Sequence, residues 1–414
     1  MKKVLVIAYY YPPIGGVGIV RTLKFTKYLP KSGWMPYVLT VKNRDHFYTD
    51  CGGDEIPDHV QVYQARNILN NLSVFEGGLR RMGIHSKVLV PDAYFGWIPL
   101  AIKMGKEIIE KEGIDLIYVS CPPHSSSLIA ARLKKITGVP FVLDLRDAWT
   151  LNPYAGQYFL SLLNKRDEKL ENNVFQSADS IIAATEGIKD DYSAKYPSAK
   201  IITLLNGFDQ DDIPSSTLPF KKFTIAYTGF FYGARSPDLL FAALAKIIQR
   251  KLIPEHDIQF LWAGRDAPFV HNLADHYQIQ NIVNYIGIVS KKEADALLYK
   301  SHLLFFVIGS TEEKSQNTTL TGKIFPYLAS GTPILAVLPD GSAKKLLEKY
   351  SDSLYTITSG DIDEGVRIIM DSYIAWRSGI NPKICTAKTE EFRKQYNYQA
   401  LTKRLARIFE ESCP

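Results

Sequence analysis

Residues 116–149 read LIYVSCPPHSSSLIAARLKKITGVPFVLDLRDAW, and this stretch decides the fold. The apolar runs Leu116–Ser120 and Pro140–Leu145 have the length of buried strands. Between them, Ser126–Thr137 has the apolar spacing of a helix, and Gly138 ends it. A strand, a helix and a second strand in this order form a right-handed unit with parallel strands. The stretch therefore predicts an α/β protein.

The same alternation fills the chain on both sides of a break. The break is residues 209–222 (DQDDIPSSTLPFKK), which are polar, contain proline and show no apolar period, as a linker does. Before it we expect strands at Lys3–Ala8, Pro36–Val41, Ser180–Ala184 and Ile201–Leu204, and helices at Gly18–Lys31, Pro99–Glu112, Leu160–Ser177 and Glu186–Lys195. After it we expect strands at Phe223–Thr228, Ile258–Ala263, Val283–Ile286, Leu303–Val307 and Pro333–Val337. The helices expected there are Pro237–Arg250, Phe269–Tyr277, Lys291–Lys300, Gly322–Ala329, Ser342–Lys349 and, beyond an irregular stretch, Tyr398–Glu411.

This order predicts two doubly wound parallel-sheet domains, each Rossmann-like, that face each other across a cleft. A chain of 414 residues is too long for one ordinary core, and two domains of about 200 residues are the usual outcome. We set the N-terminal domain at residues 1–210 and the C-terminal domain at residues 211–391.

The composition excludes several classes of protein. Hydrophobic residues make up 46% and charged residues 22%, which argues against a disordered, collagen-like or coiled-coil chain. The four cysteines form no Cys-x-x-Cys pair, so we expect neither a disulfide framework nor a metal site. No stretch approaches the roughly 20 apolar residues of a membrane span, and the apolar run Val4–Ala8 is too short for a signal peptide. We therefore expect a cytoplasmic protein.

The net charge of +6 favours anionic partners, namely phosphorylated ligands, a membrane surface or nucleic acid. Nucleic acid is the weakest of the three, because the chain has no Lys/Arg tract, zinc finger or RNA-binding aromatic signature.

Three segments of the first half follow expected strands, where ligands bind in open α/β sheets. Gly15 and Gly16 lie in PPIGGVG, where backbone amides and a helix N-terminus favour an anion; the alternative is a plain turn. His124 precedes a helix, and the alternative is a surface residue beside a Ser125 or Ser126 cap. Arg146 and Asp147 leave a buried strand together with Asp144. They are expected to be functional, with Asp147 as a base or a ligand of a sugar hydroxyl; the alternative is an Arg146–Asp147 ion pair that shapes the loop.

The second half offers candidate contacts for a phosphorylated ligand. Gly229 and Arg235 lie between an expected strand and helix, where the arginine can clamp a diphosphate; the alternative is a solvated Arg235. Gly264 and Ile288 lie in turns that suit a ribose or a flat base. Thr318, Thr321, Gly322 and Lys323 stand before a helix, and exposed amides with a lysine hold phosphate. Asn317 replaces the first glycine of a P-loop, so an ATPase is excluded.

Taken together, six segments resemble glycosyltransferases of family 4, the retaining, nucleotide-sugar-dependent enzymes of bacterial polysaccharide assembly with the GT-B fold. They are YYYPPIGGVGIVR, YVSCPPHSSSLIAARLKKITGVPFVLDLRDAW, ADSIIAATEGI, LLNGFDQDDI, YIGIVSKKEADALLYKSHLLFF and TGKIFPYLASGTPILAV. The resemblance covers nearly the whole chain. It implies a nucleotide-diphosphate sugar as co-substrate, a glycan or lipid-linked acceptor, and no metal or other cofactor.

The resemblance also implies roles for these residues. The N-terminal domain takes the acceptor, with Gly15 and Gly16 facing the cleft and His124, Arg146 and Asp147 at the reaction centre. The C-terminal domain takes the donor: Arg235 and Lys323 neutralise the diphosphate, amides near Thr321 and Gly322 assist, and Ile286–Val289 contacts the base. The C-terminal helix, within residues 392–414, packs back on the first domain.

One departure from the family concerns its Glu-x7-Glu motif. Thr318 and Pro326 stand at the two glutamate positions, and the spacing of Glu312 and Glu313 does not match. An alternative is therefore a glycan- or nucleotide-binding protein with impaired catalysis. Basic residues in Gly77–Lys87 and aromatic residues in Phe95–Pro99 also suggest peripheral membrane contact, and the alternative is a solvated loop with Trp97 packed inside.

Overall fold

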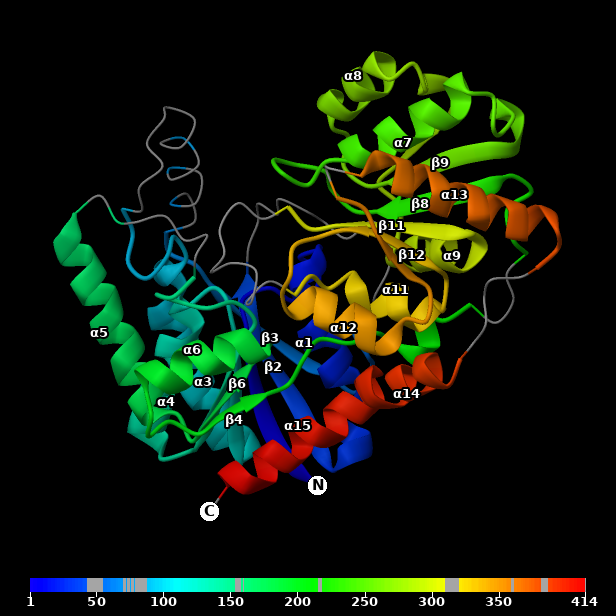
Figure 1. Ribbon diagram of the computed structural model, residues 1–414. Helices are drawn as coiled ribbons and strands as arrows, with labels where there is room; N and C mark the ends of the chain where they lie inside the picture. The colour runs from blue at the N-terminus through cyan, green and yellow to red at the C-terminus, as the bar shows by residue number, and fades with distance from the viewer. Residues whose placement is uncertain are drawn as a thin grey trace. The chain divides into compact units, whose positions relative to one another are not determined.

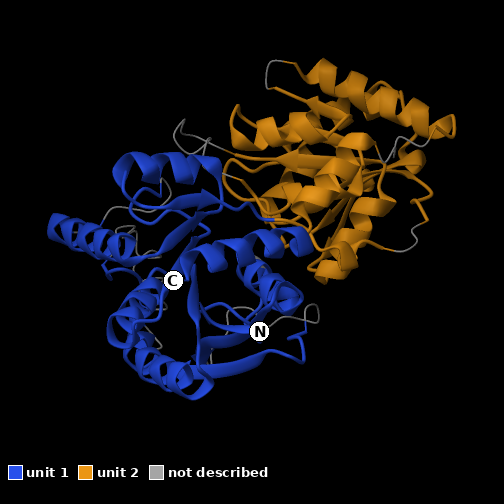
Figure 2. Cartoon of the chain, turned by 90° about the horizontal axis from the view of Figure 1, so that it is seen from below, with its two compact units in different colours: residues 1–206, 398–414 blue, residues 207–397 orange. Residues whose placement is uncertain are grey.

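The computed structural model divides the chain into two compact units, shown in Figure 2. Unit 1 comprises residues 1–206 and 398–414, and unit 2 comprises residues 207–397. Residues 207–210 and 392–397, which the sequence analysis assigned to the first domain and its returning helix, lie in unit 2. The structure describes residues 1–42, 55–69, 72, 75, 78, 88–152, 158, 160–214, 218–309, 320–358, 361–380 and 386–413.

The described residues of unit 1 form a seven-stranded parallel sheet in the order β3-β2-β1-β4-β5-β6-β7 (Figure 1). The strands are β1 (Lys2–Ala8), β2 (Trp34–Lys42), β3 (Gln61–Arg66), β4 (Leu116–Cys121), β5 (Phe141–Leu145), β6 (Ser180–Ala183) and β7 (Ile201–Thr203). The helices are α1 (Val17–Tyr28), η1 (Leu29–Ser32), η2 (Phe95–Trp97), α3 (Ile98–Glu112), α4 (Ser125–Thr137), α5 (Ser161–Ser177), α6 (Glu186–Lys195) and α15 (Tyr398–Ser412).

Helix α15 completes unit 1 from the far end of the chain. It packs against α1, and its buried Phe409 contacts the rings of Trp34 and Tyr118 at centroid distances of 5.3 and 5.5 Å. Tyr398, its first residue, contacts Phe25 of α1 at 5.6 Å. This apolar seam explains why the last helix belongs with the first strand.

The described residues of unit 2 form a six-stranded parallel sheet in the order β10-β9-β8-β11-β12-β13. The strands are β8 (Phe223–Thr228), β9 (Ile258–Ala263), β10 (Val283–Gly287), β11 (Leu303–Val307), β12 (Ile334–Val337) and β13 (Leu354–Thr356). The helices are η3 (Gln210–Asp212), α7 (Asp238–Gln249), η4 (Glu255–Asp257), α8 (Pro268–His276), η5 (Gln280–Ile282), α9 (Lys291–Lys300), α11 (Ile324–Ser330), α12 (Ser342–Tyr350), α13 (Ile362–Arg377) and α14 (Ala387–Tyr396).

The two parallel sheets with their helices confirm the predicted fold class, and each predicted strand and helix is present with its ends shifted by at most a few residues. Among the described residues, the strands β3 and β13 and the α-helices α13 and α14 were not predicted, nor were the short 3-10 helices η2 to η5. The stretch taken as irregular before the last helix is thus largely helical, which corrects the prediction. The expected linker is also corrected, because its described residues belong to unit 2 and include η3.

All strands of each sheet run the same way, so the loops that follow them gather at one edge of that sheet. The predicted site residues come from such loops. None of the helices in the described part of the chain is long and apolar enough to cross a membrane.

Candidate functional site

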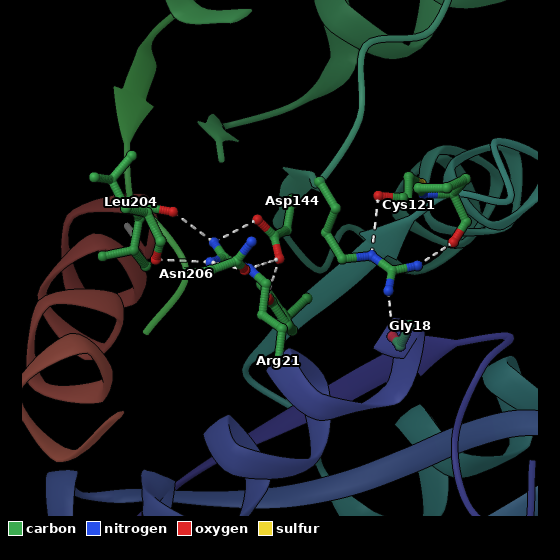
Figure 3. Close-up of polar contacts among 10 residues, drawn as sticks. Gly18, Arg21, Cys121, Asp144, Leu204 and Asn206 are labelled. Atoms are coloured by element: carbon green, nitrogen blue, oxygen red, sulfur yellow. Dashed lines mark hydrogen bonds and ion pairs between the residues drawn. The ribbon is translucent and has the colours of Figure 1, made fainter. Parts of the chain in front are cut away.

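Arg146 joins three loops at the carboxyl edge of the unit 1 sheet. Its guanidinium donates hydrogen bonds to the carbonyl oxygens of Gly18, Cys121 (3.3 Å) and Pro122 (Figure 3). These carbonyls belong to the start of α1 and to the end of β4 with the loop behind it. The alternative ion pair with Asp147 is not among the contacts of the described residues. Arg146 is thus a clamp that fixes the shape of this edge.

Asp147 follows Arg146 and is exposed. The surrounding protein lowers the hydration of its carboxyl group enough to raise its pKa above the ordinary value, and the nearby Arg146 charge opposes this rise. A carboxylate of raised pKa at a strand end suits a group that accepts or shares a proton with a bound hydroxyl.

His124 lies beside the same loop because its ring stacks on Trp149. The centroids are 4.7 Å apart and the planes differ by 5°. The Trp149 indole N–H donates to Asp167 (2.9 Å), and its backbone N–H donates to the Tyr192 hydroxyl (2.7 Å). The structure therefore brings His124 and the Asp147 loop together, as the sequence analysis expected of neighbouring strand ends.

The start of α4 differs from the predicted serine cap. The residue before the helix is His124, and its side chain does not cap the helix. The Ser125 N–H instead donates to the carboxylate of Asp92, at 2.9 Å. Burial raises the pKa of Asp92, while this and other backbone hydrogen bonds oppose the rise.

The expected anion loop holds Gly15 and Gly16 at the start of α1. Gly16 is exposed, and its φ of +99° lies in the region that side chains disfavour. The Ile19 N–H donates to the Gly16 carbonyl (3.2 Å). This geometry requires a glycine at Gly16 with or without a ligand.

Sequence reasoning missed the buried pair Arg21–Asp144, shown in Figure 3. The Arg21 guanidinium donates to both carboxylate oxygens at 2.8 and 2.9 Å, and the side chains are 3% and 0% exposed. The Tyr118 hydroxyl donates to the same carboxylate at 2.5 Å. The remaining Arg21 donors bind Leu204 O (2.8 Å), Leu205 O (2.9 Å) and Asn206 Oδ1 (3.2 Å). Arg21 thus ties α1 and β5 to the last residues of the chain before unit 2.

Two predicted residues of unit 2, Gly229 and Gly264, lie in direct contact. A Cβ on Gly264 would stand 2.0 Å from the Gly229 carbonyl oxygen. The Gly229 N–H donates to Ala263 O (2.7 Å) and the Gly264 N–H to Gly287 O (2.8 Å). The ends of β8, β9 and β10 are joined in this way, and Ile288 beyond them is 66% exposed.

Lys323 reaches into the same edge, over Gly229. Its Nζ donates to the Tyr227 hydroxyl at 2.6 Å, and a Cβ on Gly229 would lie 2.2 Å from that Nζ. Burial, with a smaller contribution from the positive charge of Arg235, lowers the pKa of Lys323 to about 7. A half-buried amine whose pKa is lowered in part by the charge of a second cation suits a site that binds an anion.

Arg235 lies over the ring of Tyr232, with its guanidinium carbon 4.9 Å from the centroid. The two residues also exchange backbone hydrogen bonds of 3.1 and 2.9 Å. Within the described ranges, neither Arg235 nor Lys323 has a carboxylate ion pair. The alternative of a solvated Arg235 is thus only partly met, because the side chain is half-buried.

The other predicted contacts flank Lys323. Thr321 is half-buried and Gly322 exposed, whereas Thr318 lies outside the described residues. Helix α11 begins at Ile324 rather than at Gly322, so Pro326 stands in its first turn, where a missing N–H costs nothing. Among the residues described, no group of three or more His, Cys, Asp and Glu side chains is placed to hold a metal ion.

Comparison with known proteins agrees with this geometry. The model of the family described as Glycosyltransferase Family 4 matches residues 14–212. An uncharacterized glycosyltransferase of Methanocaldococcus jannaschii is 22% identical over 424 residues, which are 99% of each chain.

Solved structures share the fold over the whole length. Sucrose-phosphate synthase from Thermosynechococcus elongatus has a TM-score of 0.68 at 14% identity and 99% coverage of each chain. A glycosyltransferase from Rickettsia africae has a TM-score of 0.63 at 15% identity, covering 99% of this chain and 98% of its own. WaaG, a glycosyltransferase involved in lipopolysaccharide biosynthesis, has a TM-score of 0.57 at 15% identity, covering 98% of this chain and 99% of its own. With the family match over residues 14–212 and the two parallel-sheet units, the chain is a glycosyltransferase with the GT-B fold that resembles family 4.

Proposed function

We propose that the protein moves a hexose from a nucleoside diphosphate sugar to a hydroxyl of a glycan or lipid-linked acceptor in cell-surface polysaccharide synthesis. The reaction is proposed to retain the anomeric configuration and to use no metal. The observation that carries the proposal is the half-buried Lys323, whose amine is close enough to Arg235 to be affected by its charge and has no carboxylate ion pair among the described residues. Two adjacent cations are unfavourable until an anion binds, and the diphosphate of the donor supplies that charge.

Stabilisation of the leaving group dominates the proposed mechanism. As the sugar–oxygen bond breaks, negative charge grows on the diphosphate, and Lys323 and Arg235 offset it. The departing phosphate takes the proton of the acceptor hydroxyl on the same face of the sugar. In unit 1, Asp147 and His124 orient that hydroxyl, because Arg146 and Trp149 fix their two loops.

The proposed acceptor is supported by two kinds of observation. WaaG, which shares the fold, is a glycosyltransferase involved in lipopolysaccharide biosynthesis. In unit 1, Leu160 and Leu162 are 56% and 72% exposed beside the exposed Lys165 and Arg166 of α5, a pattern that suits an anionic lipid surface.

The aromatic part of the earlier membrane hypothesis is corrected, because Trp97 is fully buried against Tyr9, and of Gly77–Lys87 only Gly78 lies within the described residues. Sedimentation with vesicles of anionic lipid at low salt tests this contact, which is rejected if the protein stays in the supernatant.

The alternative is a binding protein with impaired catalysis. It is supported by Pro326, which stands in α11 where the family carries a glutamate. Turnover separates the two functions, since the alternative predicts nucleotide binding without sugar transfer.

The experiment that tests the proposal measures binding by calorimetry to UDP, GDP, dTDP, CMP and ADP and to their sugar conjugates. We expect one diphosphate to bind selectively, and Arg235→Ala to weaken it at least tenfold because a charge-assisted contact is lost. Arg367→Ala is the control, since Arg367 is an exposed arginine of the same unit on α13. Absence of binding to every nucleotide contradicts the proposed donor site.

A further inference from the structure

The Tyr227 hydroxyl is the hydrogen-bond partner of the Lys323 amine. It donates its single proton to the Phe230 carbonyl oxygen at 3.1 Å, so its lone pairs are left for the Lys323 Nζ at 2.6 Å. The amine also lies over the Tyr227 ring, 4.1 Å from its centroid. One side chain therefore contacts both the charge of the lysine and the loop that follows β8.

Tyr227 is itself fixed in place. It is fully buried, its ring stacks on Phe231 at a centroid distance of 4.1 Å and an angle of 15°, and Phe305 contacts it at 6.0 Å. Gly229 keeps free the space that the lysine crosses, since any Cβ there would overlap the lysine. The hydroxyl is thus a rigid anchor point rather than one partner among several.

We infer that Tyr227 is a positioning residue of the donor site, whose hydroxyl holds the Lys323 amine where the diphosphate of the nucleotide sugar binds. This inference rests on the proposed function, because it takes Lys323 as the ligand of the diphosphate. Tyr227 acts through the lysine and needs no contact with the substrate.

The charges around the pair make the inference testable by pH. Among the described residues, the other titratable groups that act on Tyr227 or Lys323 are Arg235, Tyr232 and Tyr327. None of them carries a negative charge near neutral pH that would oppose the effect of burial and of the Arg235 charge, which lower the pKa of Lys323 to about 7. A diphosphate binds the ammonium form, so donor affinity is greatest below pH 7 and falls as the pH rises through the pKa of the lysine. In Tyr227→Phe the amine loses a hydrogen-bond acceptor that favours its charged form, so its pKa falls and the loss of affinity moves to lower pH.

A double-mutant cycle tests the inference by calorimetry, with the tightest binder among UDP, GDP, dTDP and ADP as the probe. Tyr227→Phe keeps the ring and removes only the hydroxyl. We expect it to weaken binding about tenfold at pH 7.5 in the wild-type background and less than twofold in the Lys323→Met background. Tyr373→Phe is the control, because it removes a hydroxyl of unit 2 that binds Asp257 at 2.9 Å.

Equal weakening in both backgrounds, or an unchanged pH profile in Tyr227→Phe, would overturn the inference and leave the proposed donor site intact. If the wild-type protein binds none of the diphosphates, the proposed function fails and the inference fails with it.

A second measurement needs no variant and so does not depend on how Tyr227→Phe folds. Calorimetry of the wild-type protein at pH 7, in two buffers of different ionisation enthalpy, reports the protons taken up on binding. We expect net proton uptake, because the neutral fraction of the Lys323 amine takes up a proton when the anion binds. Binding without proton uptake contradicts the inference that Tyr227 holds a partly neutral Lys323 amine at this site.

Discussion

Gly229 is the position where one added methyl group acts directly on the proposed donor site. Its φ is +132°, and a Cβ would lie 2.2 Å from the Lys323 Nζ. We expect Gly229→Ala to displace the lysine and to weaken diphosphate binding at least tenfold, measured by calorimetry. Gly233→Ala is the matched control: its φ of +53° brings the same kind of backbone strain, but no atom lies within 4 Å of its Cβ. Equal losses in the two variants would mean that strain, not displacement of the lysine, is responsible.

The Arg21–Asp144 pair carries a prediction about stability. Asp144→Asn removes one charge and leaves the Arg21 guanidinium buried without its counter-ion, which costs about 3–5 kcal/mol of unfolding free energy. Urea unfolding followed by circular dichroism measures the loss. Lys2→Met breaks the exposed Lys2–Glu410 pair and should leave the transition unchanged. A shift as small for Asp144→Asn would show that the pair does not hold this edge together.

At the scale of single residues, sequence reasoning singled out the glycines and the cations as candidates but missed the buried pair. Gly229, Arg235 and Lys323 stand next to strand ends, so their neighbourhood follows from the order of the elements. Arg21 lies inside a helix and Asp144 inside a strand, 123 residues apart. The available signal was a charged residue in each of two apolar runs, and pairing them requires the topology of the sheet.

Helix α5 holds the loop that follows β5 through Glu171. This carboxylate is fully buried and accepts from the Thr150 N–H and the Tyr192 hydroxyl at 2.8 and 2.9 Å, and it forms an ion pair with Lys195 at 2.6 Å. We expect Glu171→Gln to lower the unfolding free energy by about 2–3 kcal/mol, because an amide cannot accept from all of these donors. It should also slow sugar transfer more than it weakens donor binding, since the loop carries Asp147 in unit 1.

Chemical denaturation and steady-state kinetics measure both effects of Glu171→Gln. Glu168→Gln, on the exposed side of the same helix, should change neither. If Glu171→Gln destabilises the protein but leaves kcat unchanged, α5 supports the fold without positioning the reaction centre.

Whether a strand was predicted depended on how much apolar surface it buries. The central strands β1, β4 and β5 are nearly continuous apolar runs and are confirmed. The edge strand β3 buries only Ala65, and β13 has three residues, so neither gives a period that separates it from a loop. Helix α13 was missed although Val366, Ile369 and Tyr373 are buried at the helical spacing i, i+3 and i+7, so here the signal was present in the sequence.

At the scale of the whole molecule, the two units have separate cores, and each is closed by an aromatic residue from the last two helices. Phe409 of α15 is fully buried in unit 1, and Phe392 of α14 is fully buried in unit 2. We expect Phe409→Ala to cost about 3–5 kcal/mol and to speed amide exchange in β2, β4 and α1 of unit 1 but not in unit 2. Phe392→Ala should do the same in α11 and α12 only. Hydrogen exchange with mass spectrometry measures both, and faster exchange throughout the chain in either variant contradicts separate cores.

The division of the chain is the part of the architecture that the sequence describes least sharply. The polar stretch from Asp209 suggested that the chain passes from one unit to the other there. However, the Phe208 N–H already donates to the Tyr396 carbonyl inside unit 2. The passage of the chain from unit 1 to unit 2 at residues 206/207 shows no shift in composition, because the Arg21 guanidinium donates to the backbone carbonyl oxygens of Leu204 and Leu205, which any residue supplies.

The return of α15 to unit 1 has a consequence for how the protein is made. A ribosome delivers the chain from its first residue, and domains ordinarily fold in that order. Here β1 and α1 emerge first, yet the helix that covers them emerges only after all of unit 2. Unit 2, whose residues are contiguous, completes its core while unit 1 still exposes the apolar surfaces of Trp34 and Tyr118 that Phe409 later covers. The N-terminal half of the enzyme is therefore the last to mature, and a chain that stops before residue 398 leaves it open to chaperones and proteases.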